Sequence, residues 1–267
     1  MPGYYFSLRA GLSKLKLTHE QTKNRLIKED KLNPTKAEIA MGITCLACLL
    51  INVYYKIQSE TLIFILNPCH VCALAIGVLS LSTYSLKSEF LALYIFSSAF
   101  GGWIGLIFAE NEELPIIELS VYYIQHFFTS FLGPLVLSLS GRFDPLAYAA
   151  FPLPVCGFHL FCLYMRLFLC PMALLSWANL NHTLCGVGND PFYANFDMGK
   201  WYYLWADLYL LFSCYVGLIL NFVICYIVKV LIFGQKVQTF DSPQLTKGRT
   251  FLELDFWLQI WAQSSDC

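Results

Sequence analysis

The sequence predicts an all-α fold, a polytopic membrane helix bundle of about six transmembrane helices with both termini in the cytosol. Of its 267 residues, 57% are hydrophobic and only 13% are charged, whereas an average soluble domain carries about 25% charged residues. The mean hydropathy is +0.57, and the uncharged residues lie in long runs. A soluble globular domain is therefore excluded. The formal net charge of -1 gives no overall electrostatic attraction to nucleic acid.

Six apolar runs account for the predicted helices, because about 20 apolar residues cross roughly 30 Å of hydrocarbon at 1.5 Å per residue. In chain order the runs are Ile39–Tyr55, Thr61–Leu86, Phe90–Ala109, Ile116–Ser140, Leu146–Ala178 and Leu208–Val228. The first is short and uncharged, and the third is rich in glycine and phenylalanine. The fifth is too long for one straight span. Because Arg166 and Pro171 interrupt it, we expect it to bend, to re-enter the membrane or to end on an interfacial stretch.

The distribution of lysine and arginine predicts the orientation of the bundle. With six helices, fourteen of these residues fall on one side of the membrane and two on the other, while Arg166 lies within it. The connection Glu110–Glu118 carries four acidic residues and no basic one. We therefore place both termini in the cytosol and the acidic connection in the lumen or outside the cell.

Composition also divides the chain into three parts. Residues 1–36 are predicted to form a basic cytosolic arm, since residues 1–38 hold eight lysines and arginines and no apolar run of seven. Residues 37–233 form the transmembrane domain. Residues 234–267 form a cytosolic amphipathic tail, whose apolar side chains predict an interfacial helix that is too short and too charged to span.

Polar groups at membrane depth are costly, so those in the second and fourth runs are candidates for function. Cys69 lies eight residues into the second run, roughly 12 Å down the helix axis. His126 lies seven to ten residues into the fourth run, roughly 10–15 Å down. Both runs enter from the same side, so the two side chains are expected at the same level. A thiol and an imidazole so placed can act as nucleophile and base toward an acyl carbonyl.

His70 is the alternative base, and Pro68 is expected to kink the helix beside it. Neighbours on a helix point about 100° apart, so we prefer His126. Tyr122 and Tyr123 lie one turn before His126, where either hydroxyl can orient the imidazole ring. A packing role is open for both residue types, because a membrane histidine can be a hydrogen-bonded core residue and a cysteine a small buried hydrophobe.

No metal site and no cofactor are predicted. Cys45-x-x-Cys48 and Cys69-x-x-Cys72 each have the spacing of half a zinc site, but no second pair stands at metal-ligand spacing. Most of the eleven cysteines lie inside apolar runs, where they are interpreted as packing residues.

Three sequence blocks carry a family resemblance. They are Ile65–His70, Glu118–His126, and Asn179–Asn181 with Leu184-Cys185 and Asp190-Pro191-Phe192-Tyr193. In their order, and in the separation of the first two, they resemble the transmembrane protein 164 family of multi-pass membrane acyltransferases over roughly residues 37–230. Residues 37–233 are accordingly interpreted as a transmembrane acyltransferase-like domain.

The resemblance implies a lipid transacylase that moves a polyunsaturated acyl chain, notably arachidonoyl, onto lyso ether phospholipids. It implies that Cys69 carries the chain as a thioester and that His126 is its partner. The expected partners are membrane phospholipids and lysophospholipids, and the expected location is the endoplasmic reticulum or another endomembrane. Asn179 or Asn181 can orient His126 or donate to the oxyanion. The substrate-binding or orienting set is Asn67, His70, Tyr122, Tyr123, Asn179 and Asn181.

Two other functions stay open. A membrane metallohydrolase would draw its ligands from Glu118 and the histidines, although no HExxH motif or clustered spacing is present; the histidines are His70, His126, His159 and His182. A transporter, channel or scaffold would need polar groups along a continuous path across the membrane. Here the polar groups gather in the luminal half, with Arg166 as the exception.

Overall fold

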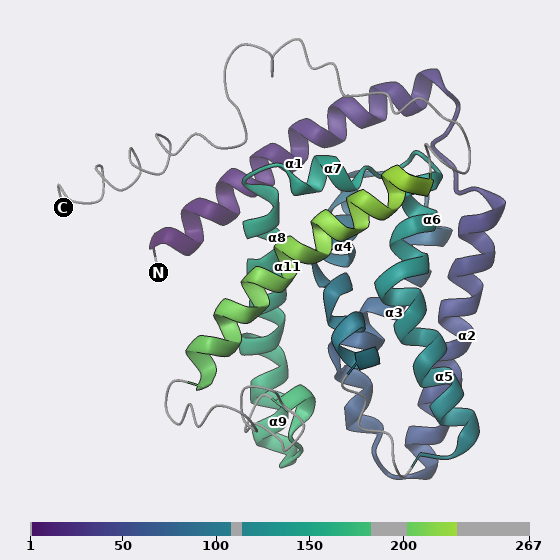
Figure 1. The fold of residues 1–267 in the computed structure, drawn as a ribbon, viewed down its shortest axis with the longest axis vertical. Coiled ribbons are helices and arrows are strands. Elements are labelled where there is room, and N and C mark those ends of the chain that lie inside the picture. The colour runs from purple at the N-terminus through teal and green to yellow at the C-terminus, as the bar shows by residue number, and fades with distance from the viewer. Residues whose placement is uncertain (1, 108–113, 183–201, 229–267) are drawn as a thin grey trace. The chain divides into compact units, whose positions relative to one another are not determined.

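The computed structural model describes residues 2–107, 114–182 and 202–228, and every regular element in these ranges is a helix (Figure 1). The chain divides into two compact units, residues 1–225 and 226–267, and the contacts given below lie within the first. The predicted tail 234–267, residues 110–113 of the acidic connection and the block Asp190–Tyr193 fall outside the described residues. The predicted all-α class is confirmed.

Three of the described helices are long and apolar enough to cross a membrane. They are α2 (Lys36–Gln58), α4 (Leu86–Ile107) and a continuous helix over Leu153–Ser176. Shorter apolar helices occur in α3 (Pro68–Leu81) and within α11 (Tyr202–Ile227). These findings support a helical membrane protein, while the number six and the cytosolic termini stay predictions.

The exterior of these helices is apolar. Large hydrophobic side chains are exposed along α2, α3, α4, the helix Leu153–Ser176 and α11; examples are Leu50, Val78, Ile107, Leu174 and Phe212. In water such a surface would be costly, whereas in lipid it has an apolar solvent. The surface therefore agrees with the hydropathy of the sequence.

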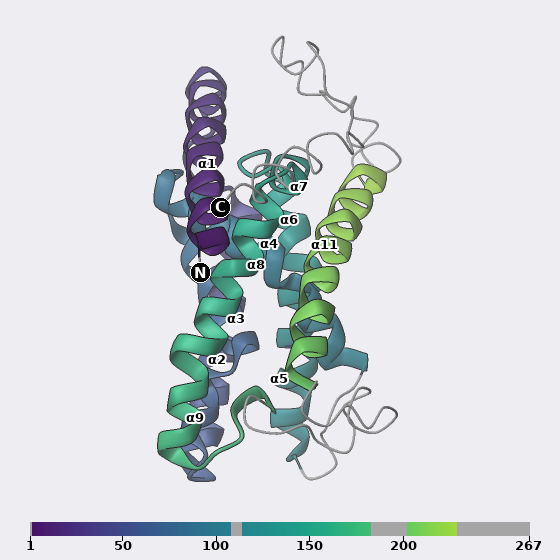
Figure 2. The same ribbon diagram turned by 90° about the vertical axis from the view of Figure 1, so that its left-hand side faces the viewer.

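The helices α2, α3 and α5 (Ile116–Phe127) lie side by side (Figures 1 and 2). Close contact of α2 and α3 depends on small residues, which let membrane helices approach one another. A Cβ atom on Gly42 would lie 2.9 Å from the Ser80 Cβ, and one on Gly77 would lie 2.7 Å from Leu46. These three helices carry the side chains of the candidate site.

The second predicted run is interrupted in the structure, and the fourth contains a π-helical segment. The second run consists of the 3-10 helix η1 (Leu62–Leu66) followed by α3, with Asn67 in an extended conformation between them. The kink expected at Pro68 is therefore confirmed. The fourth run continues from α5 through the π-helical segment η2 (Phe128–Leu132) into α6 (Gly133–Leu139).

The fifth run breaks at a different place from the one predicted. Its break separates α7 (Pro145–Ala149) from α8 (Leu153–Leu163), at Pro152. Beyond α8 the helix runs on through the π-helical segment η3 (Tyr164–Leu169) into α9 (Cys170–Ser176). Pro171 therefore causes no break: it stands in the first turn of α9, directly after the π segment, where its missing N–H is tolerated.

The basic segment at the N-terminus forms a long helix, α1 (Pro2–Lys28). It contacts α8 and α4, and one of its faces is buried. This face consists of Gly11, Leu15, Thr18, His19, Thr22 and Leu26. The segment predicted as a basic cytosolic arm is thus folded against the bundle over most of its length.

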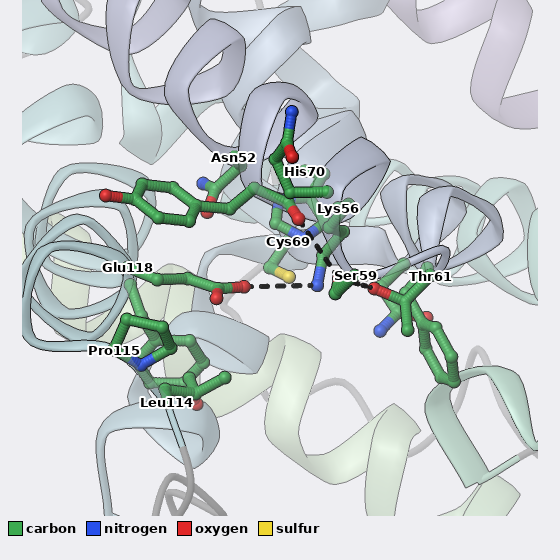
Figure 3. A pocket seen from close by; sticks show the side chains of 14 residues that line it. Asn52, Lys56, Ser59, Thr61, Cys69, His70, Leu114, Pro115 and Glu118 are labelled. Carbon is green, nitrogen blue, oxygen red and sulfur yellow. Dashed lines mark hydrogen bonds and ion pairs between the residues drawn. The ribbon is translucent and has the colours of Figure 1, made fainter.

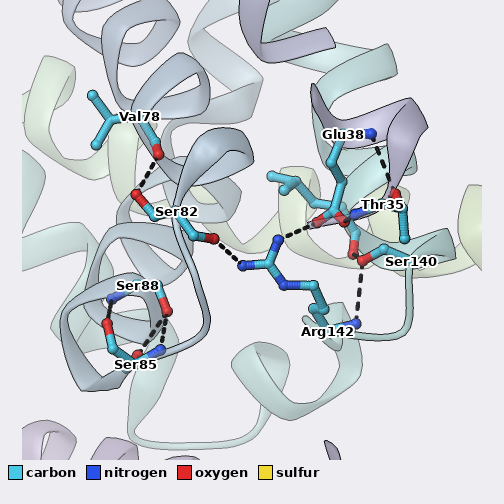
Figure 4. A network of polar contacts seen from close by, with 9 residues as sticks. Thr35, Glu38, Val78, Ser82, Ser85, Ser88, Ser140 and Arg142 are labelled. Carbon is cyan, nitrogen blue, oxygen red and sulfur yellow. Dashed lines mark hydrogen bonds and ion pairs between the residues drawn. The ribbon is translucent and has the colours of Figure 1, made fainter. Parts of the chain in front are cut away.

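A buried ion pair ties three elements together at the end of the bundle where α2 begins (Figure 4). Arg142, in the turn after α6, donates to the Glu38 carboxylate at 2.9 Å and to the Ser82 carbonyl at the end of α3 at 2.5 Å. Both charged side chains are fully buried. Glu38 also closes the capping box with Thr35 at the start of α2. Removing either charge would leave the other buried without an opposite charge, which is strongly unfavourable.

Candidate active site

A cavity of about 740 Å³ lies at the opposite end of α2, where α3 and α5 begin (Figure 3). The end of α2, the turn after it, η1, the start of α3 and the start of α5 form its wall. The lining residues are Asn52, Tyr55, Lys56, Gln58, Ser59, Thr61, Phe64, Asn67, Cys69, His70, Leu114, Pro115, Glu118 and Tyr122.

Cys69 enters this cavity from the first turn of α3. Asn67 is the N-cap residue, with φ -60° and ψ 144°, and Pro68 occupies the first helical position. Proline suits that position because its fixed φ is helical and its missing N–H would have no partner there. The Asn-Pro pair thus ends η1, starts α3 and sets the partly exposed, free Cys69 thiol at a helix N-terminus.

His70 is held by the Gln125 amide on α5, which in turn binds Asn52 on α2. Its Nδ1 lies 3.1 Å from the oxygen and 3.0 Å from the nitrogen of the Gln125 amide on α5. Asn52 on α2 donates to the same Gln125 oxygen at 2.5 Å. All three side chains are buried. This chain of contacts joins α2, α3 and α5 and fixes the orientation of the His70 ring on the cavity wall.

His126 is fixed by its own helix and by α4. Its Nδ1 lies 2.8 Å from the Tyr122 carbonyl; a carbonyl can only accept, so Nδ1 carries the proton and Nε2 is the basic nitrogen. The Tyr122 ring stands 4.0 Å from the imidazole ring, centroid to centroid, and the Tyr122 hydroxyl donates to the Gly105 carbonyl at 2.7 Å. A Cβ on Gly105 would lie 2.6 Å from Nε2, so the ring fills the space that glycine leaves.

The structure brings several of the predicted residues together, but it does not join Cys69 to His126. Cys69, His70, Asn67 and Tyr122 line one cavity, whereas His126 is not in its lining and packs against the Tyr122 ring. In the described part of the chain no hydrogen bond connects the Cys69 thiol with the His126 ring. The two imidazoles, of His70 and His126, are close enough to interact electrostatically. The Cys69–His126 pairing therefore stays a prediction.

The other predicted residues lie away from the cavity lining. Tyr123 is 43% exposed on α5. Asn179 and Asn181 follow the end of α9, and Asn181 is an exposed residue of the short helix η4 (Leu180–His182) with a φ of 45°. Neither asparagine lines the cavity. Their proposed roles toward His126 or an oxyanion stay predictions.

Two charged residues complete the cavity wall. Lys56, in the last turn of α2, has its Nζ 3.7 Å from a carboxylate oxygen of Glu118, in the first turn of α5. Each charge complements the dipole of its own helix end. We did not predict Lys56 or Asn52 as site residues. Their spacing of four places both on one face of an apolar helix. This spacing is the feature of the sequence that could have predicted them.

A profile of the TMEM164 family matches residues 10–218. The chain belongs to the TMEM164 family. No solved structure matches it. The family match includes the whole cavity lining and His126, and it begins within α1, so the basic helix is largely part of the family's shared region.

A membrane metallohydrolase was one of the alternative functions that the sequence left open. Among the described residues, no group of three or more histidine, cysteine, aspartate and glutamate side chains comes together as a set of metal ligands. Glu118 is paired with Lys56, and His70 with an amide. The described side chains therefore give no support to a metallohydrolase.

Proposed function

We propose that this TMEM164-family protein is a membrane lipid acyltransferase that carries the acyl chain on Cys69. The observation that carries the proposal is the position of Cys69: a free, partly exposed thiol at a helix N-terminus, in the wall of a cavity within an apolar bundle. In such a cavity the thiol is placed to attack the ester carbonyl of a membrane lipid, because sulfur is a strong nucleophile.

The transfer proceeds in two steps. In the first, an imidazole takes the Cys69 proton and sulfur attacks the acyl ester of a donor phospholipid. The ester C–O bond breaks, the imidazolium returns the proton to the departing lysophospholipid oxygen, and a thioester remains. In the second, the imidazole takes a proton from the acceptor hydroxyl, which attacks the thioester. The C–S bond breaks and the proton passes to Cys69.

His126 is the proposed base. Its Nδ1 proton is committed to the Tyr122 carbonyl, so Nε2 carries the lone pair that would accept the thiol proton. His70 is the alternative, because it lines the same cavity as Cys69. Its Nδ1 is occupied by Gln125, which leaves its own Nε2 as the candidate nitrogen. The experiment below separates the two.

The backbone amide of Cys69 is the proposed donor to the oxyanion of the tetrahedral intermediate. Pro68 has no N–H, and the amides of His70 and Val71 both donate to the Asn67 carbonyl, at 3.0 and 3.2 Å. Of the first four amide positions in α3, Cys69 alone keeps an N–H that no backbone carbonyl accepts among the described residues. A first-turn amide beside the nucleophile has the geometry of an oxyanion hole.

The finer assignment follows the family resemblance. The acyl chain is polyunsaturated, notably arachidonoyl, and the acceptors are lyso ether phospholipids. The reaction takes place in the endoplasmic reticulum or another endomembrane. It uses no cofactor, because the thioester conserves the energy of the donor ester.

The decisive experiment is peptide mass spectrometry of the purified full-length protein after incubation with an arachidonoyl phospholipid. We expect an arachidonoyl adduct on Cys69 that hydroxylamine removes. Cys69→Ala abolishes the adduct, and His126→Ala slows its formation about 100-fold or more, the usual contribution of a general base. Cys72→Ala, one turn further along α3, is the matched control and leaves the adduct on Cys69 unchanged.

The same measurement on His70→Ala distinguishes the two histidines. If His70→Ala stops adduct formation and His126→Ala does not, His70 is the base. An adduct-free wild-type protein that is shown to be folded would overturn the proposal, and so would an unchanged transfer rate in Cys69→Ala.

A further inference from the structure

The charged pair in the cavity wall has no part in the acyl-transfer steps. Lys56 and Glu118 are nearly buried, with side-chain exposures of 16% and 9%. Their atoms are 3.7 Å apart, which is too far for a direct hydrogen bond. Burying charges in a membrane protein is expensive and needs good hydrogen bonding to be repaid. This ion pair has no direct hydrogen bond to help offset that cost.

Both groups keep unused hydrogen-bonding capacity. Among the described residues, the Lys56 ammonium contacts Glu118 and lies 5.8 Å from the centre of the Phe64 ring. The Glu118 carboxylate has no hydrogen-bond partner in the same part of the chain. Asn67 in the same wall has a buried side-chain oxygen that is also without a partner there. The cavity therefore presents a cation, an anion and a neutral acceptor to whatever occupies it.

The pair lies next to the nucleophile. Lys56 is close enough to interact electrostatically with both Cys69 and His70, and Figure 3 shows the Cys69 sulfur beside the ion pair. If the pair binds a headgroup, the ligand atoms next to that headgroup would therefore lie near the Cys69 thiol. In a lysophospholipid those neighbouring atoms are the glycerol carbons that carry the acceptor hydroxyl.

We propose that Lys56 and Glu118 form a headgroup site for a zwitterionic phosphoamine lipid, with Lys56 binding the phosphate and Glu118 the amine. This inference rests on the proposed function, whose acceptor it specifies. A zwitterion brings one opposite charge to each member of the pair, so the charges in the cavity stay balanced. An anionic headgroup without an amine satisfies Lys56 and leaves Glu118 facing like charge, which disfavours it.

The test measures occupancy of the site without relying on catalysis. The full-length protein in detergent micelles is treated with N-ethylmaleimide, and alkylation of Cys69 is followed by peptide mass spectrometry. Three lysophospholipids with one acyl chain compete: lysophosphatidylethanolamine, lysophosphatidylcholine and lysophosphatidic acid. We expect either zwitterionic lipid to protect Cys69 at about tenfold lower mole fraction than the anionic one, the effect of one charged contact.

Variants assign the two charges separately. Lys56→Gln is expected to weaken protection by all three lipids about tenfold, and Lys56→Arg to keep it. Glu118→Gln is expected to remove the preference for zwitterionic lipids, because the like-charge penalty disappears. Lys87→Gln, an exposed lysine of α4, is the matched control and leaves every protection curve unchanged. Protection of each variant is scored against the alkylation rate of that same variant without lipid, because Lys56 interacts electrostatically with Cys69.

The possible results separate this inference from the proposed function. Equal protection by zwitterionic and anionic lipids in the wild-type protein overturns the headgroup site, even if an acyl adduct forms on Cys69. Unchanged curves in Lys56→Gln and Glu118→Gln overturn it as well. If the expected protection pattern occurs but no adduct ever forms, the headgroup site stands and the acyltransferase proposal fails.

Discussion

At the scale of single residues, the position of the His126 ring depends on Gly105 of α4, which has no Cβ atom. The imidazole occupies the space beside Gly105 on α4, and the Tyr122 hydroxyl bonds to the carbonyl of that same glycine. Gly105 is thus a positioning residue for the ring. The sequence shows glycines in this helix, but it does not show which of them faces an imidazole.

We predict that Gly105→Ala impairs acyl transfer because the new methyl group would meet the His126 ring at 2.5 Å from Cδ2 and 2.6 Å from Nε2. Displacing a catalytic group by a fraction of an ångström to 1 Å lowers rates about 10- to 100-fold. The measurement is the rate of acyl-adduct formation on Cys69.

The matched control for this prediction is Gly101→Ala, one turn earlier in α4. A Cβ there meets nothing within 4 Å. This change should leave the rate unaltered and stabilise the helix by about 0.5–1 kcal/mol, the usual gain over glycine. Equal rates in both variants would show that the position of the His126 ring is unimportant.

At the scale of elements, α1 differs most from its predicted form. Its buried residues recur at the spacing of one helical face, but Gly11, Thr18, His19 and Thr22 among them are small or polar. The face therefore lacks a continuous apolar stripe, and the eight basic residues of the region dominate its composition. The composition of the segment gives only its average polarity. The packing of α1 depends instead on the few side chains that contact α8 and α4.

We predict that Leu15→Ala loosens α1 from the bundle, because Leu15 is 1% exposed in the main core. Truncating a buried leucine to alanine costs about 2–5 kcal/mol. Hydrogen exchange of the α1 amides in micelles measures the free energy of local opening.

Leu17→Ala is the matched control on the same helix, since Leu17 is 51% exposed. Its amides should exchange at the wild-type rate. If the two variants exchange alike, α1 is not held by this face and the contact with α8 does not determine its position.

At the scale of the whole molecule, the two ends of α2 carry different chemistry. One end holds the buried Glu38–Arg142 pair, and the other holds the cavity with Cys69 and the Lys56–Glu118 pair. The excess of lysine and arginine predicts that the Glu38 end faces the cytosol. The candidate active site would then open toward the lumen.

We predict that a glycosylation acceptor inserted between Ser59 and Glu60 is modified, while one between Asp30 and Lys31 is not. The two positions flank α2 and must lie on opposite sides if α2 spans the membrane. The insertions are made in Asn181→Gln, which removes the natural sequon Asn181-His182-Thr183. A gel shift read before and after deglycosylation gives the answer. Modification of the second position alone would reverse the predicted orientation.

The sequence by itself determined the all-helical class, the apolar runs, the break at Asn67-Pro68 and the family. These properties depend on local composition and on residues within one or two turns of each other. Only the tertiary structure decided that Asn52, Gln125 and His70 form one chain of contacts and that Lys56 meets Glu118. The residues that Gln125 contacts, His70 and Asn52, are 55 and 73 residues away from it in the sequence. Helical periodicity predicts which face of a helix a residue is on, but it does not predict which other helix that face contacts.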